Sequence, residues 1–433
     1  MQWIQSFIVG KEDDMKDYKL NLINKCELEK EKIIKLASDL IKIPSENPPG
    51  DVREIMSFIE NWLCENGLNN LKFISANPIK PNIIAEVGKG NPVIILNGHA
   101  DVVQAGDRAR WEFNPFAGEI KDGFLLGRGA SDMKSGVAGI MYAVSLVKQI
   151  EDRLKGTVKL IIVSDEETGG KFGSHWLFNK RRDLLTGDGC IIAEPSDSGT
   201  GGATVGQKGN LWVKFIAKGR SAHGSLAPYV GDNAILKLMR IIQKADRVRS
   251  IKSIIPDDAK EVMKTSKEHI SRSYNNSEIT NVLDHVTVNI GMIKGGDAPN
   301  IVPPMAEMIW DMRVPIGIST GEVINILQEI IKDENDIDIE IIERGEPNYT
   351  PISSKIIQTL KENIKEIENK DLDLTYQWAS SDAKFFRKAG TPTIQFGPSV
   401  LEGIHSFNEK VKIDDIVTAT KVYLGTIIDF LNT

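Results

Sequence analysis

The residues of this chain best suited to chemistry are histidines and acidic residues that come directly after apolar runs. The runs and the groups that follow them are 93–96 with His99 and Asp101, 158–163 with residues 165–167, and 190–193 with Glu194. Each run predicts a buried β-strand. Ligands collect at the carboxyl ends of the strands in an open α/β sheet, so we expect these side chains to meet at one edge of one sheet.

The residue types in this set are those that a pair of zinc ions needs. Zinc binds imidazole nitrogen and carboxylate oxygen, and a catalytic site keeps one position open for water. Two ions about 3.5–4 Å apart need a shared ligand, and a carboxylate with two oxygens suits that task. Asp132 is the candidate bridge. The other candidate ligands are His99 and Glu194 for one ion, and Glu167 and His405 for the second ion.

Two further carboxylates have different expected roles. Asp101 lies two residues after His99 and points the same way, so we expect it to accept the second N–H of that imidazole. Because Glu167 can ligate, its neighbour Glu166 is left to take a proton from water and pass it to the leaving amine.

Composition excludes several classes of function. The 433 residues include 53 basic and 60 acidic ones, for a net charge of −7, and no dense Lys/Arg run predicts a nucleic-acid surface. The apolar segment 3–9 lacks a basic flank and is too short for a signal peptide or a membrane span. Three cysteines far apart in sequence form no disulfide framework or zinc knuckle. We therefore expect a cytoplasmic protein with no membrane or nucleic-acid partner.

The pattern of elements predicts a discontinuous catalytic domain. Strands and helices alternate up to Glu194, which is typical of a mostly parallel α/β sheet covered on both faces. Past residue 205 the strands alternate apolar with polar residues, which fits a sheet with one wet face. We expect a catalytic domain at 20–205 and 347–433, a smaller inserted α+β domain at 206–346, and an extension at 1–19 of unknown role.

The sequence resembles one known family, and the resemblance covers nearly the whole chain from about residue 28. The chain resembles the two-zinc aminoacylase/carboxypeptidase family, in its acetylornithine deacetylase and succinyl-diaminopimelate desuccinylase branch. The segments that carry the resemblance are 45–50, 97–101, 127–136, 165–170, 193–196 and His405. The resemblance implies the same five ligands for two Zn²⁺ ions (with Co²⁺ or Mn²⁺ as substitutes), Glu166 as general acid/base, Asp101 orienting His99, and a cis peptide after Asp132. Glutamate at Glu194 is similar to the deacylases of the family, where other branches have histidine or aspartate.

The resemblance also assigns roles in the inserted domain, which it implies is a ferredoxin-like lid and dimerisation domain. His223 matches a lid histidine that donates to the tetrahedral oxyanion, often in the site of the partner subunit of a homodimer. Asn300 and Arg313 match positions that hold the substrate's α-carboxylate. The alternative for Arg313 is a salt bridge with Asp311 within the lid sheet.

The expected function is hydrolysis of the amide of an N-acyl-L-amino acid, by water on zinc with Glu166 as general base. One alternative is a metal-dependent dipeptidase or aminoacylase on the same scaffold, since peptide and acyl amides require the same chemistry at the metal. Another is a catalytically silent peptide-binding protein, which the presence of Glu166 and all five ligands disfavours. The acyl group and the amino acid of the substrate depend on the shape of the pocket, which the sequence does not give.

Overall fold

The computed structural model describes residues 2–432 and divides into two compact units. Unit 1 comprises Met1–Val205, Thr350–Thr375 and Ser381–Thr433, and unit 2 comprises Gly206–Tyr349 and Tyr376–Ser380. The short segment Tyr376–Ser380 thus belongs with unit 2, whereas the sequence predicts it to lie in the catalytic domain. The roles of the two units as catalytic domain and lid stay predictions.

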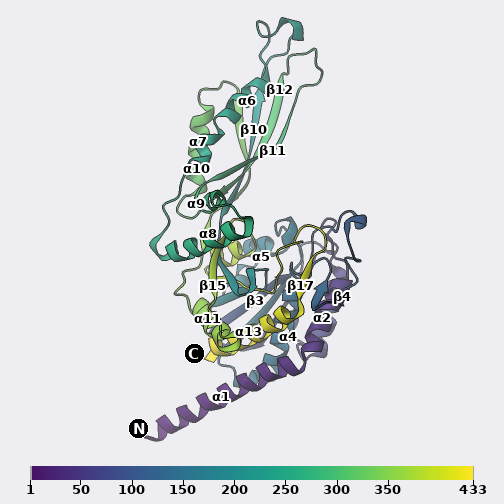
Figure 1. The fold of residues 1–433 in the computed structure, drawn as a ribbon, viewed down its shortest axis with the longest axis vertical. Coiled ribbons are helices and arrows are strands. Elements are labelled where there is room, and N and C mark those ends of the chain that lie inside the picture. The colour runs from purple at the N-terminus through teal and green to yellow at the C-terminus, as the bar shows by residue number, and fades with distance from the viewer. Residues whose placement is uncertain (1, 433) are drawn as a thin grey trace. The chain divides into compact units, whose positions relative to one another are not determined.

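Unit 1 is built on a mixed, mostly parallel sheet with helices packed against it (Figure 1). The strand order of the sheet is β1 (Leu71–Ile74), β2 (Asn82–Gly88), β6 (Thr157–Val163), β3 (Val93–His99), β7 (Gly189–Ile192), β16 (Thr393–Gln395), β9 (Gly202–Gln207) and β14 (Asn348–Tyr349), and β15 (Asp373–Gln377) also pairs with β9. The central strands β6, β3, β7 and β16 are parallel. Nearly every residue of β6 and β3 is buried, as continuous apolar runs require when both faces of a sheet are covered. The predicted fold class is confirmed.

The helices of unit 1 pack against the sheet and position the loops at its edge. They are α1 (Gln2–Leu28), α2 (Lys30–Lys42), α3 (Arg53–Glu65), α4 (Lys134–Lys148), α5 (Ser174–Lys180), α11 (Lys355–Glu368), α12 (Ala383–Ala389) and α13 (Ile413–Asn432). α4 packs against α13 and β3. A Cβ at Gly136 in the first turn of α4 would lie 2.1 Å from the carbonyl oxygen of Ala193, so only glycine permits this approach. The close contact places the start of α4 beside the end of β7.

A small three-stranded sheet joins two loops that are far apart in sequence. Its order is β17 (Lys410–Lys412), β5 (Phe124–Leu126) and β4 (Glu119–Lys121), with antiparallel pairing throughout. Because β17 pairs with β5, the loop that precedes β17 lies next to the loop that follows β5. These two loops carry His405 and Asp132.

The first helix continues through the predicted extension. α1 runs to Leu28, and the chain then begins α2 at Lys30. The Lys19 ammonium donates to Asp429 of α13 at 2.8 Å, so the second half of α1 is bound to the body of unit 1. In Figure 1 the purple end of α1 points away from that body. The role of residues 1–19 is still unassigned.

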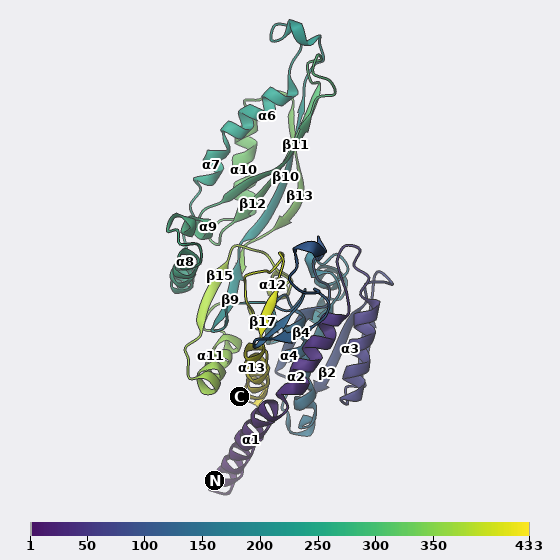
Figure 2. The same cartoon turned by 45° about the vertical axis from the view of Figure 1, so that its right-hand side comes forward.

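Unit 2 is a four-stranded antiparallel sheet with helices along one side (Figure 2). Its order is β11 (Thr287–Gly295), β12 (Met305–Val314), β10 (Gly209–Lys218) and β13 (Ile337–Gly345), and its helices over the sheet are α6 (Ala234–Gln243), α7 (Ala245–Arg249) and α10 (Thr320–Ile331). On β12, Met308, Trp310 and Met312 are buried under the helices, and the residues between them face the open side.

Unit 2 also contains α8 (Lys260–Tyr274) and α9 (Asn281–Asp284), for which the sequence pattern gives no clear signal. α8 buries only Val262, Met263, Ser266 and Ile270, and most of its other residues are charged or polar. Such a thin apolar stripe is a weak helix signal. The hydroxyl of Ser266 accepts a hydrogen bond from the backbone N–H of Tyr376 at 2.7 Å, which ties α8 to the segment Tyr376–Ser380.

Across the described residues, no helix is both long enough and apolar enough to cross a membrane.

Candidate metal centre

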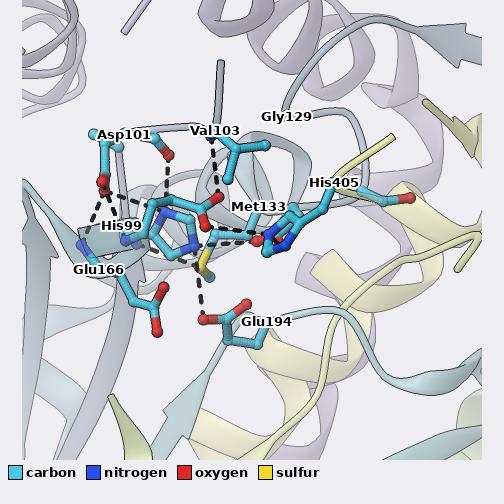
Figure 3. Close-up of polar contacts among 12 residues, drawn as sticks. His99, Asp101, Val103, Gly129, Met133, Glu166, Glu194 and His405 are labelled. Carbon is cyan, nitrogen blue, oxygen red and sulfur yellow. Dashed lines mark hydrogen bonds and ion pairs between the residues drawn. The ribbon is translucent and has the colours of Figure 1, made fainter. Parts of the chain in front are cut away.

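Three neighbouring strands of unit 1 place most of the candidate ligands. His99 is the last residue of β3, Glu167 lies just after β6, and Glu194 lies two residues after β7. Since these strands are parallel and adjacent, their carboxyl ends share one edge of the sheet. The loops before α4 and β17 add Asp132 and His405 at the same edge. His405 is labelled in Figure 3.

The structure brings the five predicted ligands together as two groups of three. The first group is His99, Asp132 and Glu194, and the second is Asp132, Glu167 and His405. Within each group, one donor atom from each residue lies within 4.8 Å of the others. Asp132 belongs to both groups.

The two oxygens of Asp132 face different histidines. Its Oδ1 lies 3.1 Å from Nε2 of His99, and its Oδ2 lies 3.3 Å from Nε2 of His405. Nε2 of His99 is 3.6 Å from Glu194, and Nε2 of His405 is 3.1 Å from Glu167. This is the arrangement expected of a carboxylate that bridges two cations. The peptide between Asp132 and Met133 is cis, as the family resemblance implies.

The charges of the cluster fit divalent cations. Burial and the neighbouring Asp132 raise the pKa of Glu194 well above its usual value. Hydrogen bonds to Asp132 and Glu167 raise the pKa of His405 to about 10. Carboxylates buried this close together repel one another, and a cation between them relieves that repulsion. A set of imidazole nitrogens and carboxylate oxygens is what Zn²⁺ binds in catalytic sites, so the residues present fit this ion.

Asp101 contacts His99 through both its main chain and its side chain. Nδ1 of His99 lies 2.9 Å from the backbone carbonyl oxygen of Asp101 and 3.4 Å from its carboxylate. A carbonyl can only accept, so Nδ1 carries the proton and Nε2 is left with a lone pair for a metal. The Asp101 carboxylate also accepts from the backbone N–H groups of Glu166 at 3.1 Å and Glu167 at 3.2 Å. The main-chain carbonyl of Asp101 is the shorter contact to His99, and its side chain also holds the acidic loop.

Glu166 belongs to neither group of candidate ligands. Its side chain points into the same space as Glu194 (Figure 3). Burial raises the pKa of Glu166 well above its usual value, and the nearby Glu194 and Asp382 raise it further. A carboxyl group with a raised pKa can hold a proton near neutral pH, which is the property a general acid/base requires.

Sequence reasoning missed Glu409, which is fully buried behind the centre. Its Oε1 accepts from the backbone N–H groups of Ser131 at 2.9 Å and Asp132 at 3.0 Å, and its Oε2 accepts from that of Gly129 at 3.1 Å. Glu409 also forms a buried ion pair with Arg128. A glutamate in a loop is usually exposed, so its residue type carried no signal of this role.

The three predicted residues of the inserted domain lie in unit 2. The backbone N–H of Gly224, next to His223, donates to the carbonyl of Asn300 at 2.7 Å, so the structure brings these two segments together. Nδ1 of His223 accepts from the backbone N–H of Ser225 at 3.3 Å. The proton of a neutral His223 is therefore on Nε2, which is available as a donor.

Arg313 forms the ion pair with Asp311 that was the alternative interpretation. Its Nε and Nη2 donate to the two oxygens of Asp311 at 2.9 and 3.0 Å along one strand, β12. A guanidinium has five N–H groups. Three of them have no partner in the described part of the chain, so the ion pair leaves Arg313 able to bind a ligand.

Comparison with known proteins identifies the family. The model of Peptidase family M20/M25/M40 matches residues 95–429. Among curated proteins, a succinyl-diaminopimelate desuccinylase of Ehrlichia canis is 29% identical over 416 residues, covering 92% of this chain and 98% of the relative.

Solved structures share the fold. An M20 family metallo-carboxypeptidase from Sulfolobus solfataricus matches with a TM-score of 0.78 at 19% identity, covering 93% of this chain and 99% of that one. A Bacillus subtilis protein described as a dinuclear metal-binding peptidase of the M20 family matches with a TM-score of 0.67 at 14% identity, covering 94% and 99%. The family predicted from the motifs is confirmed: this chain is a metal-dependent hydrolase that belongs to peptidase family M20/M25/M40.

Proposed function

We propose that this protein hydrolyses the amide bond of N-acyl-L-amino acids, such as acetyl or succinyl derivatives, with the help of two zinc ions. The observation that supports this most is the pair of ligand groups that share Asp132. The ions would be held by His99 and Glu194 on one side, and by Glu167 and His405 on the other. Once bound, they would polarise the amide carbonyl and lower the pKa of water.

The residues around the ligands perform the proton transfers. Glu166 takes the proton of the attacking water and delivers it to the leaving amine, and its raised pKa supports this role. Asp101 holds Glu166 in position through the backbone N–H of that residue. The Nε2–H of His223 donates to the oxyanion, which a preorganised donor can stabilise by about 3–4 kcal/mol.

The substrate's α-carboxylate binds Arg313, with Asn300 as a second contact. Guanidinium and carboxylate form paired charge-assisted hydrogen bonds. The three remaining N–H groups of Arg313 support this assignment.

The protein forms a homodimer through unit 2. Edge strand β11 exposes Met292 and Ile293, and helix α6 exposes Leu236 and Met239. An edge strand with apolar side chains and unpaired backbone groups favours pairing with another chain.

The second candidate function is that of a dipeptidase or aminoacylase. The match to the fold of a metallo-carboxypeptidase supports this alternative. Turnover of N-acetyl- and N-succinyl-amino acids and of a few dipeptides, assayed with added zinc, tests the proposal. Hydrolysis of the acylated amino acids supports it, and hydrolysis of dipeptides alone supports the second candidate. A protein that binds metal but cleaves neither would be the silent binding protein.

A further inference from the structure

Unit 2 contains a cavity of about 550 Å³ that no predicted role accounts for. Its walls come from α8, from α9 and the turn before it, from β11 and β12, and from Tyr376–Ser380, the segment that joins unit 2 from far along the sequence. A volume of this size is typical of sites that bind small molecules.

The wall of the cavity is mainly apolar. Ile270 and Tyr274 of α8, Ile279, Val282 and Trp378 line it. Tyr274 and Trp378 are 57% and 37% exposed, so two large aromatic side chains at one cavity are left open to solvent. The free energy falls when an apolar group covers aromatic surface of this kind.

One charged residue, Arg313, also lines the cavity, and no acidic side chain is among the described residues that do so. The buried ammonium of Lys208 is close enough to Arg313 for that guanidinium to help lower the pKa of Lys208. The Asp311 carboxylate that pairs with Arg313 is not among the residues that line the cavity, so the charged group that faces the cavity is the guanidinium. A ligand that suits it has a carboxylate for Arg313 and an apolar body for the aromatic wall.

We infer that this cavity is the side-chain pocket of the substrate, and that the protein acts on N-acyl-L-amino acids with bulky apolar side chains. The inference rests on the proposed function, with Arg313 as the contact of the α-carboxylate. The side chain of an amino acid branches from the carbon next to its carboxylate. A substrate held at Arg313 thus presents its side chain to the walls of the same cavity.

The same chemistry rejects substrates with a second ammonium group. Ornithine and diaminopimelate carry an amine on the side chain, and this cavity offers a guanidinium and no carboxylate to pair with it. An unpaired ammonium next to a guanidinium is repelled, so such substrates are selected against. This specificity differs from that of the desuccinylases to which the chain is similar.

A binding measurement tests the pocket without relying on turnover. The probe is 3-phenylpropionate, which has a carboxylate and an aromatic body but no amide, and its Kd is measured by calorimetry on the full chain. We expect Trp378→Ala and Tyr274→Ala each to weaken binding by about 10-fold. Tyr229→Ala is the matched control, because Tyr229 is a 93% exposed tyrosine of unit 2 that does not line the cavity.

A further variant tests the pocket even if replacing Trp378 or Tyr274 by alanine disturbs the fold. Ala379 is exposed and lines the cavity, so Ala379→Glu adds a carboxylate there with little effect on packing. We expect it to weaken binding of 3-phenylpropionate. It should also raise kcat/KM for N-acetyl-L-ornithine relative to N-acetyl-L-phenylalanine.

Turnover separates this inference from the proposed function. With the wild type, we expect kcat/KM for N-acetyl-L-phenylalanine to exceed that for N-acetyl-L-alanine by about 10-fold or more, and ornithine and diaminopimelate derivatives to be poorer. Hydrolysis that favours the ornithine or diaminopimelate derivative would overturn the pocket and leave the proposed function standing. Absence of any amide hydrolysis, with 3-phenylpropionate bound in a Trp378-dependent way, would overturn the proposed function and leave the pocket. If 3-phenylpropionate does not bind, the inference of a substrate pocket is wrong, whether or not the protein hydrolyses amides.

Discussion

Glu409 accepts a hydrogen bond from the backbone N–H of Asp132 at 3.0 Å, and it is fully buried. It lies four residues after His405, on the loop that enters β17. One buried carboxylate thus connects the backbone of the candidate bridging ligand with the loop of a second ligand. The positions of Asp132 and His405 relative to each other depend on this contact.

Glu409→Gln should lower the affinity for metal by about 10–100-fold, as is typical when a residue that orients a ligand is changed. The amide keeps one accepting oxygen but loses the charge that pairs with Arg128. Metal affinity is measured by competition with a chelator, together with thermal melting. Glu402→Gln, an exposed glutamate of the same loop, is the control. Unchanged metal affinity in Glu409→Gln with a lowered Tm would show that Glu409 serves only the fold.

Glu166→Ala should keep its metal while losing turnover by a factor of about 10²–10⁴, because Glu166 handles the proton and not the ion. Glu167→Ala should instead lose one ion. Metal analysis of the two purified variants checks both expectations. A Glu166→Ala protein without metal beside a fully loaded Glu167→Ala protein would reverse the assignment within the pair.

Arg313→Ala should lower kcat/KM for free N-acyl-amino acids by about 2–3 kcal/mol, the loss expected for a charge-assisted hydrogen bond. Substrates whose carboxylate is capped as an amide should scarcely change, since they have no charge to lose. Asp311 loses its ion-pair partner in this variant. Thermal melting therefore accompanies the kinetics, and equal losses on free and capped substrates would mark Arg313 as structural.

Lys208 should make the stability of unit 2 depend on pH. Burial, helped by Arg313, lowers the pKa of Lys208 to about 7, while its ammonium donates to the carbonyls of Val282 and His285. An unfolded lysine titrates near 10.5, so between pH 7 and 10.5 the unfolded chain binds more protons than the folded one. Stability from this group therefore rises with pH across that window, and the burial cost is largest below pH 7.

Lys208→Met isolates this effect, because it removes the titrating group and leaves the others. The free energy of unfolding of the wild type, relative to Lys208→Met, should rise by about 2 kcal/mol from pH 7 to pH 9. Urea denaturation at a series of pH values measures the difference. Parallel pH profiles for the two proteins would contradict the lowered pKa.

If the protein forms the proposed homodimer, its mass in solution should fall when the edge of unit 2 is altered. Met292→Lys and Ile293→Lys should shift sedimentation from dimer to monomer, since charges on an edge strand oppose pairing. Leu401→Lys, an exposed leucine of unit 1, is the control. A monomeric wild type at micromolar concentration with full activity would rule out a required dimer.

The sequence by itself determined which residues gather at the candidate metal centre. Apolar runs predict buried strands, and parallel strands end at one edge, so the positions of His99, Glu167 and Glu194 followed from where the runs stop. The order of the motifs supplied the family, and the family model confirmed it.

Only the tertiary structure decided how these residues are held. The main-chain carbonyl of Asp101, and not its carboxylate, lies closer to His99. The choice between two acceptors on one residue depends on backbone direction, which no residue type encodes. Glu409 was hidden for a similar reason, because burial of a loop glutamate results from folding of segments that are distant in sequence.

The substrate cavity is the clearest case of information that the chain carries only when folded. α8 has a thin apolar stripe, and Trp378 lies more than a hundred residues after it. Neither segment predicts a pocket alone. Their walls enclose a volume because Tyr376–Ser380 returns to unit 2 and bonds to Ser266, a long-range contact that short-range sequence patterns cannot contain.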